Sequence, residues 1–279
     1  SPNTPVDLLS NGTKWETKMV VTGSHNDITL EPNITFLDNA GNPGNYIKGV
    51  ATPSVTIDKN IPILIPDSIT FKNKGTESTE WVKANEVVQL TFETSEPIQI
   101  PTVTITSGAS YGVVCPPINS PGTNIWNVEY TTTPSDTEGF MTYMIVFNDL
   151  AGNPGVCPTP PDLLKLDMTA PVVSLVTPTS NSFINNINVG YTITDSNPIA
   201  SGKVTFTEID GTLDNINSHE VTLVGTELSN LKPLGPLCVP PNLIDGAKYD
   251  IKFTFTDMAG NSGFKYVSVN ENLISYLAP

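Results

Sequence analysis

Three aspartates occupy the same position in a short motif that recurs along the 279-residue chain. Asp38, Asp149 and Asp257 each begin a D-x-A-G-N sequence, and the motif returns about every 110 residues. Carboxylate and amide oxygens gathered in this way suit a hard cation such as Ca²⁺. The same residue types also form tight turns, because aspartate accepts hydrogen bonds from nearby backbone amides and glycine adopts positive φ. Both interpretations stay open for this motif.

A second acidic motif keeps the same phase as the first. The segments IDKNIP (57–62) and LDMTAP (166–171) each follow a D-x-A-G-N sequence at a similar interval. Their acidic residues are Asp58 and Asp167. We interpret the two segments as linkers, each of which closes one domain and opens the next.

The stretches between these motifs have the pattern of β-strands. Val88, Leu90 and Phe92 alternate with polar residues, which predicts a strand with one buried face. No amphipathic helical stretch of useful length is found, and 25 prolines and 20 glycines interrupt the chain at intervals suited to short strands. The sequence therefore predicts an all-β chain.

The period of the repeat fits one small β-sandwich of about 100 residues. Its phase predicts immunoglobulin-like domains at 58–167 and 168–279. Residues 1–57 match only the C-terminal half of such a domain, which would be incomplete or completed by strands from a neighbour. Phe147 and Phe255 stand at the same offset before their turn aspartates, so we expect both to be buried at equivalent places.

The turn and linker motifs together resemble the bacterial Ig-like repeats of adhesins and other prokaryotic surface proteins. The resemblance rests on segments such as Asp149-Leu150-Ala151-Gly152-Asn153 and Asp167-Met168-Thr169-Ala170-Pro171, and it covers nearly the whole chain. It implies tandem immunoglobulin-like antiparallel β-sandwiches. It also implies an extracellular, cell-surface location. The implied partners are further Ig-like repeats of the same chain or of neighbouring subunits, and a host or matrix ligand.

The topology of such a sandwich predicts which carboxylates would lie beside each turn aspartate and bind a cation with it. The loop that joins the last two strands lies beside the entering linker and beside the loop after the second strand. Carboxylates from these three places would then meet at each junction and bind calcium. The predicted ligands are Asp58, Glu96 and Asp149 at the first junction and Asp167, Asp195 and Asp257 at the second, with Glu93 as an alternative to Glu96.

Composition and charge exclude several classes of function. The formal net charge is −15 and the sequence pI is about 4.3, so the chain should repel nucleic acid and anionic membranes. No run of apolar residues is long enough for direct membrane insertion. The first residues lack the charged and apolar regions of a secretory signal, and we expect the chain to be mature or an excerpt of a longer protein.

Motifs that carry catalysis are not found in the sequence. There is no G-x-S-x-G, H-E-x-x-H, C-x-x-C or phosphate-binding glycine-rich loop. The two histidines, His25 and His219, lie in polar segments typical of loops or strand ends. We therefore expect no enzyme but a structural repeat segment of an extracellular surface protein, such as an adhesin stalk, a surface layer or a filament subunit. The alternatives are a glycan- or protein-binding module and spacer domains of a secreted hydrolase. An exposed aromatic cluster on one domain would favour the binding module, but the aromatic residues that recur at matching repeat positions do not suggest such a cluster.

Cysteine usage gives one further expectation. Cys115 and Cys157 fall within one repeat and are candidates for a disulfide bond, which leaves Cys238 without a partner.

Overall fold

The computed structural model describes residues 22, 27–30, 35–44, 55–109, 112–158, 164–179, 182–184 and 186–267, with the backbone alone at 175 and at 274–276. Within these residues β-strands predominate, and the helical segments are two 3₁₀ turns, η1 (Pro66–Ser68) and η2 (Gly225–Leu228). No helix of the described chain is long and apolar enough to cross a bilayer. The predicted all-β class is confirmed.

The first sandwich consists of two sheets whose strands are mostly antiparallel. One sheet has the order β10 (Ile118–Asn119), β11 (Ile125–Thr131), β7 (Val87–Glu93) and β5 (Thr70–Asn73). The other has the order β6 (Trp81–Val82), β13 (Lys165–Leu166), β12 (Gly139–Val146), β8 (Thr102–Ser107) and β9 (Val113–Cys115). In the letters used for immunoglobulin domains, β5, β7, β11 and β10 are strands A, B, E and D, and β8, β12 and β13 are strands C, F and G. Sheets ABED and CFG are the immunoglobulin arrangement, and the short strands β6 and β9 extend the second sheet at its two edges.

The second sandwich also consists of two sheets, but the sheet that corresponds to the four-stranded one has three described strands. One sheet has the order β14 (Val172–Thr177), β16 (Asn188–Thr194) and β19 (Leu231–Pro236). The other has the order β15 (Phe183–Ile184), β22 (Ile274–Tyr276), β20 (Ala247–Asp257), β17 (Ile199–Gly211) and β18 (Ser218–Thr222), and β21 (Ser262–Tyr266) also pairs with β20. In both sandwiches a short early strand pairs in parallel with the last strand, β6 with β13 and β15 with β22.

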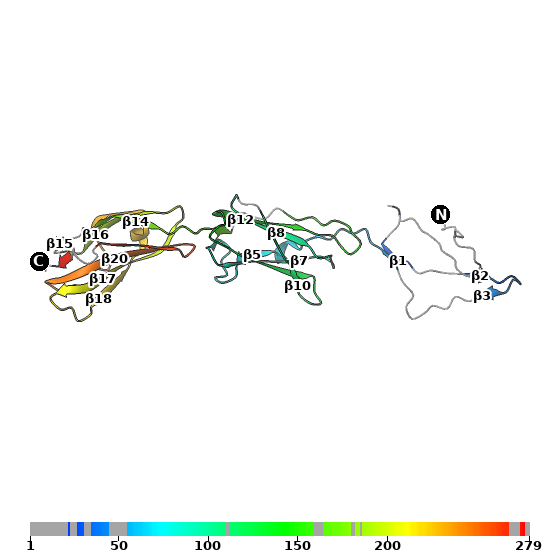
Figure 1. Cartoon of the computed structure of the whole chain (residues 1–279), viewed down its shortest axis with the longest axis horizontal. Helices are drawn as coiled ribbons and strands as arrows, with labels where there is room; N and C mark the ends of the chain where they lie inside the picture. The colour runs from blue at the N-terminus through cyan, green and yellow to red at the C-terminus, as the bar shows by residue number, and fades with distance from the viewer. Residues whose placement is uncertain are drawn as a thin grey trace.

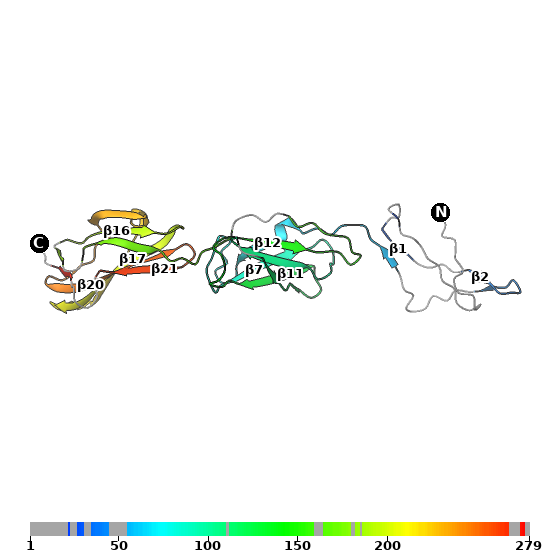
Figure 2. The ribbon, with the colours of Figure 1, turned by 45° about the horizontal axis from the view of Figure 1, so that its top comes forward.

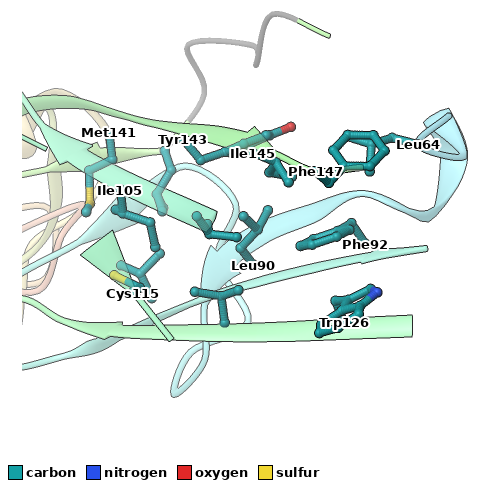
Figure 3. Packing of buried hydrophobic residues seen from close by; sticks show 14 of the residues in the cluster. Leu64, Leu90, Phe92, Ile105, Cys115, Trp126, Met141, Tyr143, Ile145 and Phe147 are labelled. Carbon is teal, nitrogen blue, oxygen red and sulfur yellow. The ribbon is translucent and has the colours of Figure 1, made fainter. Parts of the chain in front are cut away.

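Alternation along the strands builds the core of the first sandwich. Val88, Leu90 and Phe92 of β7 are fully buried while their neighbours face outward, as the period-two pattern predicts. Figure 3 shows Phe92 and Trp126 on one side of the core and Phe147 on the other. Side chains from the two sheets thus meet in one apolar layer. The buried residues of this layer come from the segment that begins at Leu64 and ends at Leu166.

The second core is built in the same way, and its fully buried aromatic residues are Tyr191, Phe206, Tyr249, Phe253 and Phe255. Every second residue of β20 is buried, including Phe253 and Phe255. Tyr191 of the facing sheet packs against both rings, with its own ring centroid 5.0 Å from that of Phe255. Phe147 and Phe255 are therefore both buried just before their turns, as expected from the repeat.

Strands are also described near the N-terminus. β1 (Ile28–Leu30) pairs with β4 (Val55–Ile57), and β2 (Phe36–Leu37) pairs with β3 (Pro43–Gly44) across the first D-x-A-G-N turn. The rest of the half domain expected at 1–57, including His25, lies outside the described residues.

The prediction of a disulfide bond between Cys115 and Cys157 is wrong, because all three cysteines are free thiols. Cys115 pairs with Val103 on β8, and Val103 pairs with Ile145 on β12. Cys157 lies beyond β12 on the far side, two residues after Gly155, whose amide bonds to the carbonyl of Phe147. Three strand spacings of about 4.8 Å place the two cysteines roughly 14 Å apart, which is too far for a bridge.

The two sandwiches lie end to end along the long axis of the molecule (Figure 1). The view turned by 45° shows the same arrangement (Figure 2). The segment 167–171 connects them, so the loops at the entry of the second sandwich face the exit of the first.

Candidate cation sites at the two junctions

The D-x-A-G-N turn has one geometry in all three of its occurrences. In the second occurrence, Asp149 Oδ1 accepts hydrogen bonds from the backbone amides of Gly152 at 2.6 Å and Asn153 at 2.8 Å. The other carboxylate oxygen, Asp149 Oδ2, accepts one from the side-chain amide of Asn153 at 2.6 Å. Gly152 has φ +98°, a conformation that glycine adopts without strain. The equivalent aspartate–asparagine pairs are Asp38 with Asn42 and Asp257 with Asn261.

The asparagine of the turn also binds the preceding linker. Asn153 Nδ2 lies 3.1 Å from the carbonyl oxygen of Asp58, and Asn261 Nδ2 lies 3.0 Å from that of Asp167. One side-chain amide thus joins the turn carboxylate to the linker backbone. This bond fixes the place of each linker aspartate relative to the following sandwich.

A carboxylate on the preceding side binds the same linker. Glu138 Oε1 accepts hydrogen bonds from the amide of Met168 at 2.7 Å and from the hydroxyl of Thr169 at 2.8 Å. At the first junction, Asp27 Oδ1 accepts one from the amide of Lys59 at 2.9 Å. Asp27 and Glu138 stand at the same offset before their turn aspartates, so the two junctions share this contact.

The first junction brings together Asp58 of the linker, Glu96 after β7 and Asp149 of the turn. One carboxylate oxygen of each lies within 4.8 Å of the others. The Asp149 side chain is 0% exposed. Burial raises the pKa of Asp149, but hydrogen bonds from Asn153 and Gly152 outweigh burial and hold that pKa below its usual value. Burial, followed by the charges of Asp58 and Asp149, raises the pKa of Glu96.

The second junction brings together Asp167 of the linker, Asp195 after β16 and Asp257 of the turn. Their nearest oxygens also lie within 4.8 Å of one another, and Asp167 and Asp257 are each 1% exposed. Asp167 Oδ2 and Asp195 Oδ2 are buried and accept no hydrogen bond from any described residue. A buried carboxylate oxygen without a partner is costly, and a bound cation is one physical reason for such a group to persist.

The pKa of Asp167 is affected by its burial and by the two neighbouring carboxylates. Burial raises the pKa of its carboxyl group above the usual value, and the charges of Asp257 and Asp195 raise it further. The backbone amide of Thr169 and the side chain of Asn197 act in the opposite direction. The charged form of Asp167 is therefore disfavoured in the protein without an ion.

The donor sets of both junctions fit calcium. They offer hard oxygen ligands only, from three separate segments. Backbone carbonyls or waters would have to supply the rest of the 6–8 positions that Ca²⁺ takes. Among the described residues, no lysine forms an ion pair with any of the six carboxylates. A divalent cation would remove the mutual repulsion that three close carboxylates otherwise feel.

Two lysines of the first sandwich reach the loops that carry the second cluster. Lys83 Nζ lies 3.1 Å from the carbonyl oxygen of Gly260, in the D-x-A-G-N turn. Lys165 Nζ lies 2.5 Å from Asn197 Oδ1, in the loop after β16, and 5.3 Å from the ring centroid of Trp81. At the first junction Thr56 occupies the place of Lys165, since Thr29 and Thr56 pair as Phe140 and Lys165 do. The position of Lys165 is therefore not a lysine at the first junction.

All six residues proposed from the sequence as ligands therefore fall into the two groups that were expected. Glu93, the alternative to Glu96, lies on β7 outside the first group. Sequence reasoning missed the linker contacts of Asn153, Asn261 and Glu138. The recurrence of an acidic residue at the position of Asp27 and Glu138 was the signal that could have revealed one of these contacts.

His219 belongs to a separate polar network. Its Nε2 lies 2.6 Å from Asp214 Oδ2, and the hydroxyl of Tyr249 donates to the same oxygen at 2.6 Å. Asp214 also accepts a hydrogen bond from the amide of Ile216. These bonds outweigh the effect of burial and lower the pKa of Asp214 to about 2. The network ties the β17–β18 hairpin to β20, which is a structural role.

Comparison with known proteins gives matches among solved structures alone. No family model matches the chain, and no curated protein does. A tetra-tandem repeat in the extending region of a large adhesion protein matches 74% of this chain at 17% identity, with a TM-score of 0.27. This chain spans about half of that one, 48% of its length.

Two tandem-domain structures from other proteins also match. The FN1–FN3 domains of chicken CNTN1 match 84% of this chain and 76% of their own at 8% identity, with a TM-score of 0.29. The Dpr2 Ig1–Ig2 and DIP-Theta Ig1–Ig3 complex matches 78% of this chain and 67% of its own at 11% identity, with a TM-score of 0.31. All three are similar to this chain as tandem β-sandwich domains.

Proposed function

We propose that this chain is a structural repeat segment of an extracellular surface protein, and that calcium bound at its junctions stiffens it. The proposed setting is an adhesin stalk, a surface layer or a filament subunit. The observation that carries the proposal is the recurrence, at two junctions, of three carboxylates from a linker, a loop after the second strand and a D-x-A-G-N turn.

The ion would connect parts of the chain that move relative to one another if the linker bends. Asp58 and Asp167 lie on the linkers, whereas the other four ligands lie on the sandwich that follows. Neutralising the cluster would therefore hold the linker against the loops of that sandwich. Sites in extracellular proteins have dissociation constants of about 10⁻⁴ to 10⁻³ M, which match the calcium concentration outside cells.

The contacts that do not need an ion support the same architecture. Each linker forms hydrogen bonds with residues on both sides of it. Asp27 or Glu138 binds it from the preceding part of the chain, and Asn153 or Asn261 binds it from the sandwich that follows. Because these hydrogen bonds limit bending at the linker, they suit a segment that holds an extended shape. Partners in this role are further repeats of the same chain or neighbouring subunits.

The test is thermal unfolding of the full chain in calcium, in magnesium and in chelator. We expect calcium to raise the unfolding midpoint and magnesium to raise it less, because Mg²⁺ requires a tighter octahedral site. The double variant Asp167→Asn/Asp257→Asn should lose the part of the rise that belongs to the second sandwich. Asp67→Asn, which removes an exposed carboxylate outside both clusters, is the control.

Small-angle X-ray scattering on the same samples tests stiffening itself. The maximum dimension should be larger and its distribution narrower with calcium than with chelator. If calcium changes neither the midpoint nor the scattering, the six carboxylates are turn and linker residues and the proposal of a calcium-stiffened segment fails.

A further inference from the structure

An exposed aromatic cluster lies on the outer face of the second sandwich. Phe264 and Tyr266 of β21 are 59% and 41% exposed, and their ring centroids lie 5.7 Å apart at an interplanar angle of 76°. Lys252 of the neighbouring β20 places its Nζ 4.7 Å from the Phe264 centroid and 5.3 Å from the Tyr266 centroid. Figure 2 shows β21 beside β20 on this sheet.

The pairing of the strands explains why the three side chains share one face. Lys252 is directly opposite Tyr266, and Phe264 is opposite Thr254. The odd-numbered residues of β20 point into the core, so Lys252 and Thr254 point outward together with the two rings. Because the rings are two residues apart on β21, they lie side by side on the surface.

The repeat provides an internal comparison for this surface. With Phe147 and Phe255 in register, Lys252 corresponds to Met144, Phe264 to Val156 and Tyr266 to Pro158. The first sandwich therefore has aliphatic side chains and a proline where the second has two aromatic rings and an ammonium group. A stalk requires no such difference between its domains, which points to a property that only the second sandwich has.

Within the described part of the chain, Lys252 makes cation–π contacts and no ion pair. Its neighbours Lys203 and Lys248 form ion pairs with Glu220 and Asp210, respectively, at 2.7 and 2.6 Å. Lys252 contacts the two rings instead and pairs with no described carboxylate. Among the described residues, the ammonium group of Lys252 thus lies against two aromatic rings, whereas those of Lys203 and Lys248 lie against carboxylates.

We propose that Phe264, Tyr266 and Lys252 form a binding site for a glycan that contains a carboxylated sugar, such as a hexuronic acid. The C–H face of a pyranose carries partial positive charge and packs on the electron-rich face of an aromatic ring. The sugar carboxylate then pairs with the ammonium group of Lys252. The hydroxyl of Thr205, which lies opposite Lys252 on β17, is a polar group within the same face for the sugar hydroxyls.

A small ligand fits this surface better than a protein does. The aromatic cluster is bordered by Asp250, by the Lys203–Glu220 pair and by threonines. Two partly exposed rings do not approach the roughly 800 Å² per partner of a stable protein interface. The net charge of the chain does not prevent binding of an anion, because charges more than about 8 Å away are screened at physiological ionic strength. Asp250 lies two residues from Lys252 on the same face of β20, about 7 Å along the strand, so its charge is not screened in this way and weakens the attraction for an anion.

The experiment titrates the ¹⁵N- and ¹³C-labelled full chain with oligogalacturonate and, separately, with a neutral cello-oligosaccharide of the same length, followed by NMR. Oligogalacturonate should shift the signals of Phe264, Tyr266 and Lys252. Phe264→Ala and Tyr266→Ala should each weaken binding at least about ten-fold, and Lys252→Gln about five-fold. Added salt should weaken the binding of oligogalacturonate to the wild type.

Matched controls are Phe183→Ala, which removes a ring that is also exposed, and Lys248→Gln, which removes a lysine paired with Asp210. Neither should change binding. The proposal is overturned if oligogalacturonate causes no shifts at ~10 mM, or if Lys252→Gln binds it as tightly as the wild type. It is also overturned if the three signals shift with protein concentration alone, since the occupant would then be a second copy of the chain.

Discussion

The side-chain amide of Asn261 lies 3.0 Å from the carbonyl oxygen of Asp167, 94 positions earlier in the chain. The same amide donates to the carboxylate of Asp257, so one side chain connects a turn of the second sandwich to the linker that enters it. Asn153 makes the equivalent pair of contacts with Asp58 and Asp149. A motif whose residues also suit a simple turn thus has a second role in joining domains.

Replacing this asparagine should destabilise the second sandwich. Asn261→Ala leaves the Asp167 carbonyl and one oxygen of the buried Asp257 carboxylate without a donor, which should lower the free energy of unfolding by about 1–3 kcal/mol. Urea denaturation of the full chain in chelator measures the change. The control is Asn215→Ala, at an exposed position outside the junction. An equal effect of the two substitutions would show that the linker contact contributes nothing.

In the absence of calcium, the stability of the folded protein should depend on pH through the raised pKa of Asp167. Its pKa is raised in the folded protein, so protonation favours the folded state, and the stability linked to this group is lost as pH rises above the ordinary value of about 3.8. In chelator, Asp167→Asn should therefore be more stable than the wild type at pH 7, with the difference shrinking toward pH 4. Thermal midpoints over this range test the prediction. A wild type more stable than the variant at pH 7 in chelator would contradict it.

Removing the two lysines at the second junction should loosen it without unfolding either sandwich. The double variant Lys83→Met/Lys165→Met loses the contacts to Gly260 and Asn197 but keeps most of the apolar volume. Spin labels on the two sandwiches should show a broader distance distribution across the junction. Lys203→Met, which breaks an exposed ion pair, is the control. An unchanged distribution in the double variant would mean that the linker contacts alone set the orientation.

The glycine after the second turn should not tolerate a side chain. A Cβ on Gly155 would lie 2.1 Å from the ring of Phe147, which is held in the core and cannot move away. We expect Gly155→Ala to cost roughly 1–3 kcal/mol through overpacking. Gly122→Ala is a useful comparison, because that position has open space but a φ of +74°. A smaller effect at Gly155 than at Gly122 would show that the ring adapts.

Asp214 should contribute to acid unfolding of the second sandwich. Its pKa is lowered to about 2, so its stabilising effect is complete above the ordinary pKa of about 3.8 and is lost as pH falls toward 2. Asp214→Asn should remove this part of the pH dependence and lower stability at pH 7. Circular dichroism during acid titration measures both effects. Asp210→Asn, on the surface nearby, should leave the stability at pH 7 nearly unchanged.

Much of the fold could be predicted because the repeat gave the same information more than once. The alternation in Val88, Leu90 and Phe92 determined which face of the strand is buried, and the phase of the turns placed Phe147 and Phe255 at equivalent positions. The grouping of the six carboxylates followed from topology, since the linker, the loop after the second strand and the final turn must meet at one end of each sandwich.

Other features depended on geometry that a linear pattern does not contain. The Cys115–Cys157 bridge was wrong because membership of one repeat does not reveal that two strands separate the residues. The contacts of Lys83 and Lys165 depend on how one sandwich faces the next. The aromatic cluster was missed because Lys252 and Tyr266 are fourteen residues apart and become neighbours only through strand pairing.

The parallel pairing of β6 with β13 and of β15 with β22 has a consequence for how the chain responds to tension. When a sandwich is pulled by its two ends, the early strand and the last strand are drawn in opposite directions along their shared edge. The hydrogen bonds between them are then loaded in shear and must rupture together rather than one after another. Ile63 and Val156 add a further parallel bridge at the entry end of the first sandwich. Each sandwich therefore has a force-bearing edge between its entry and exit strands, in line with the junctions that connect it to its neighbours.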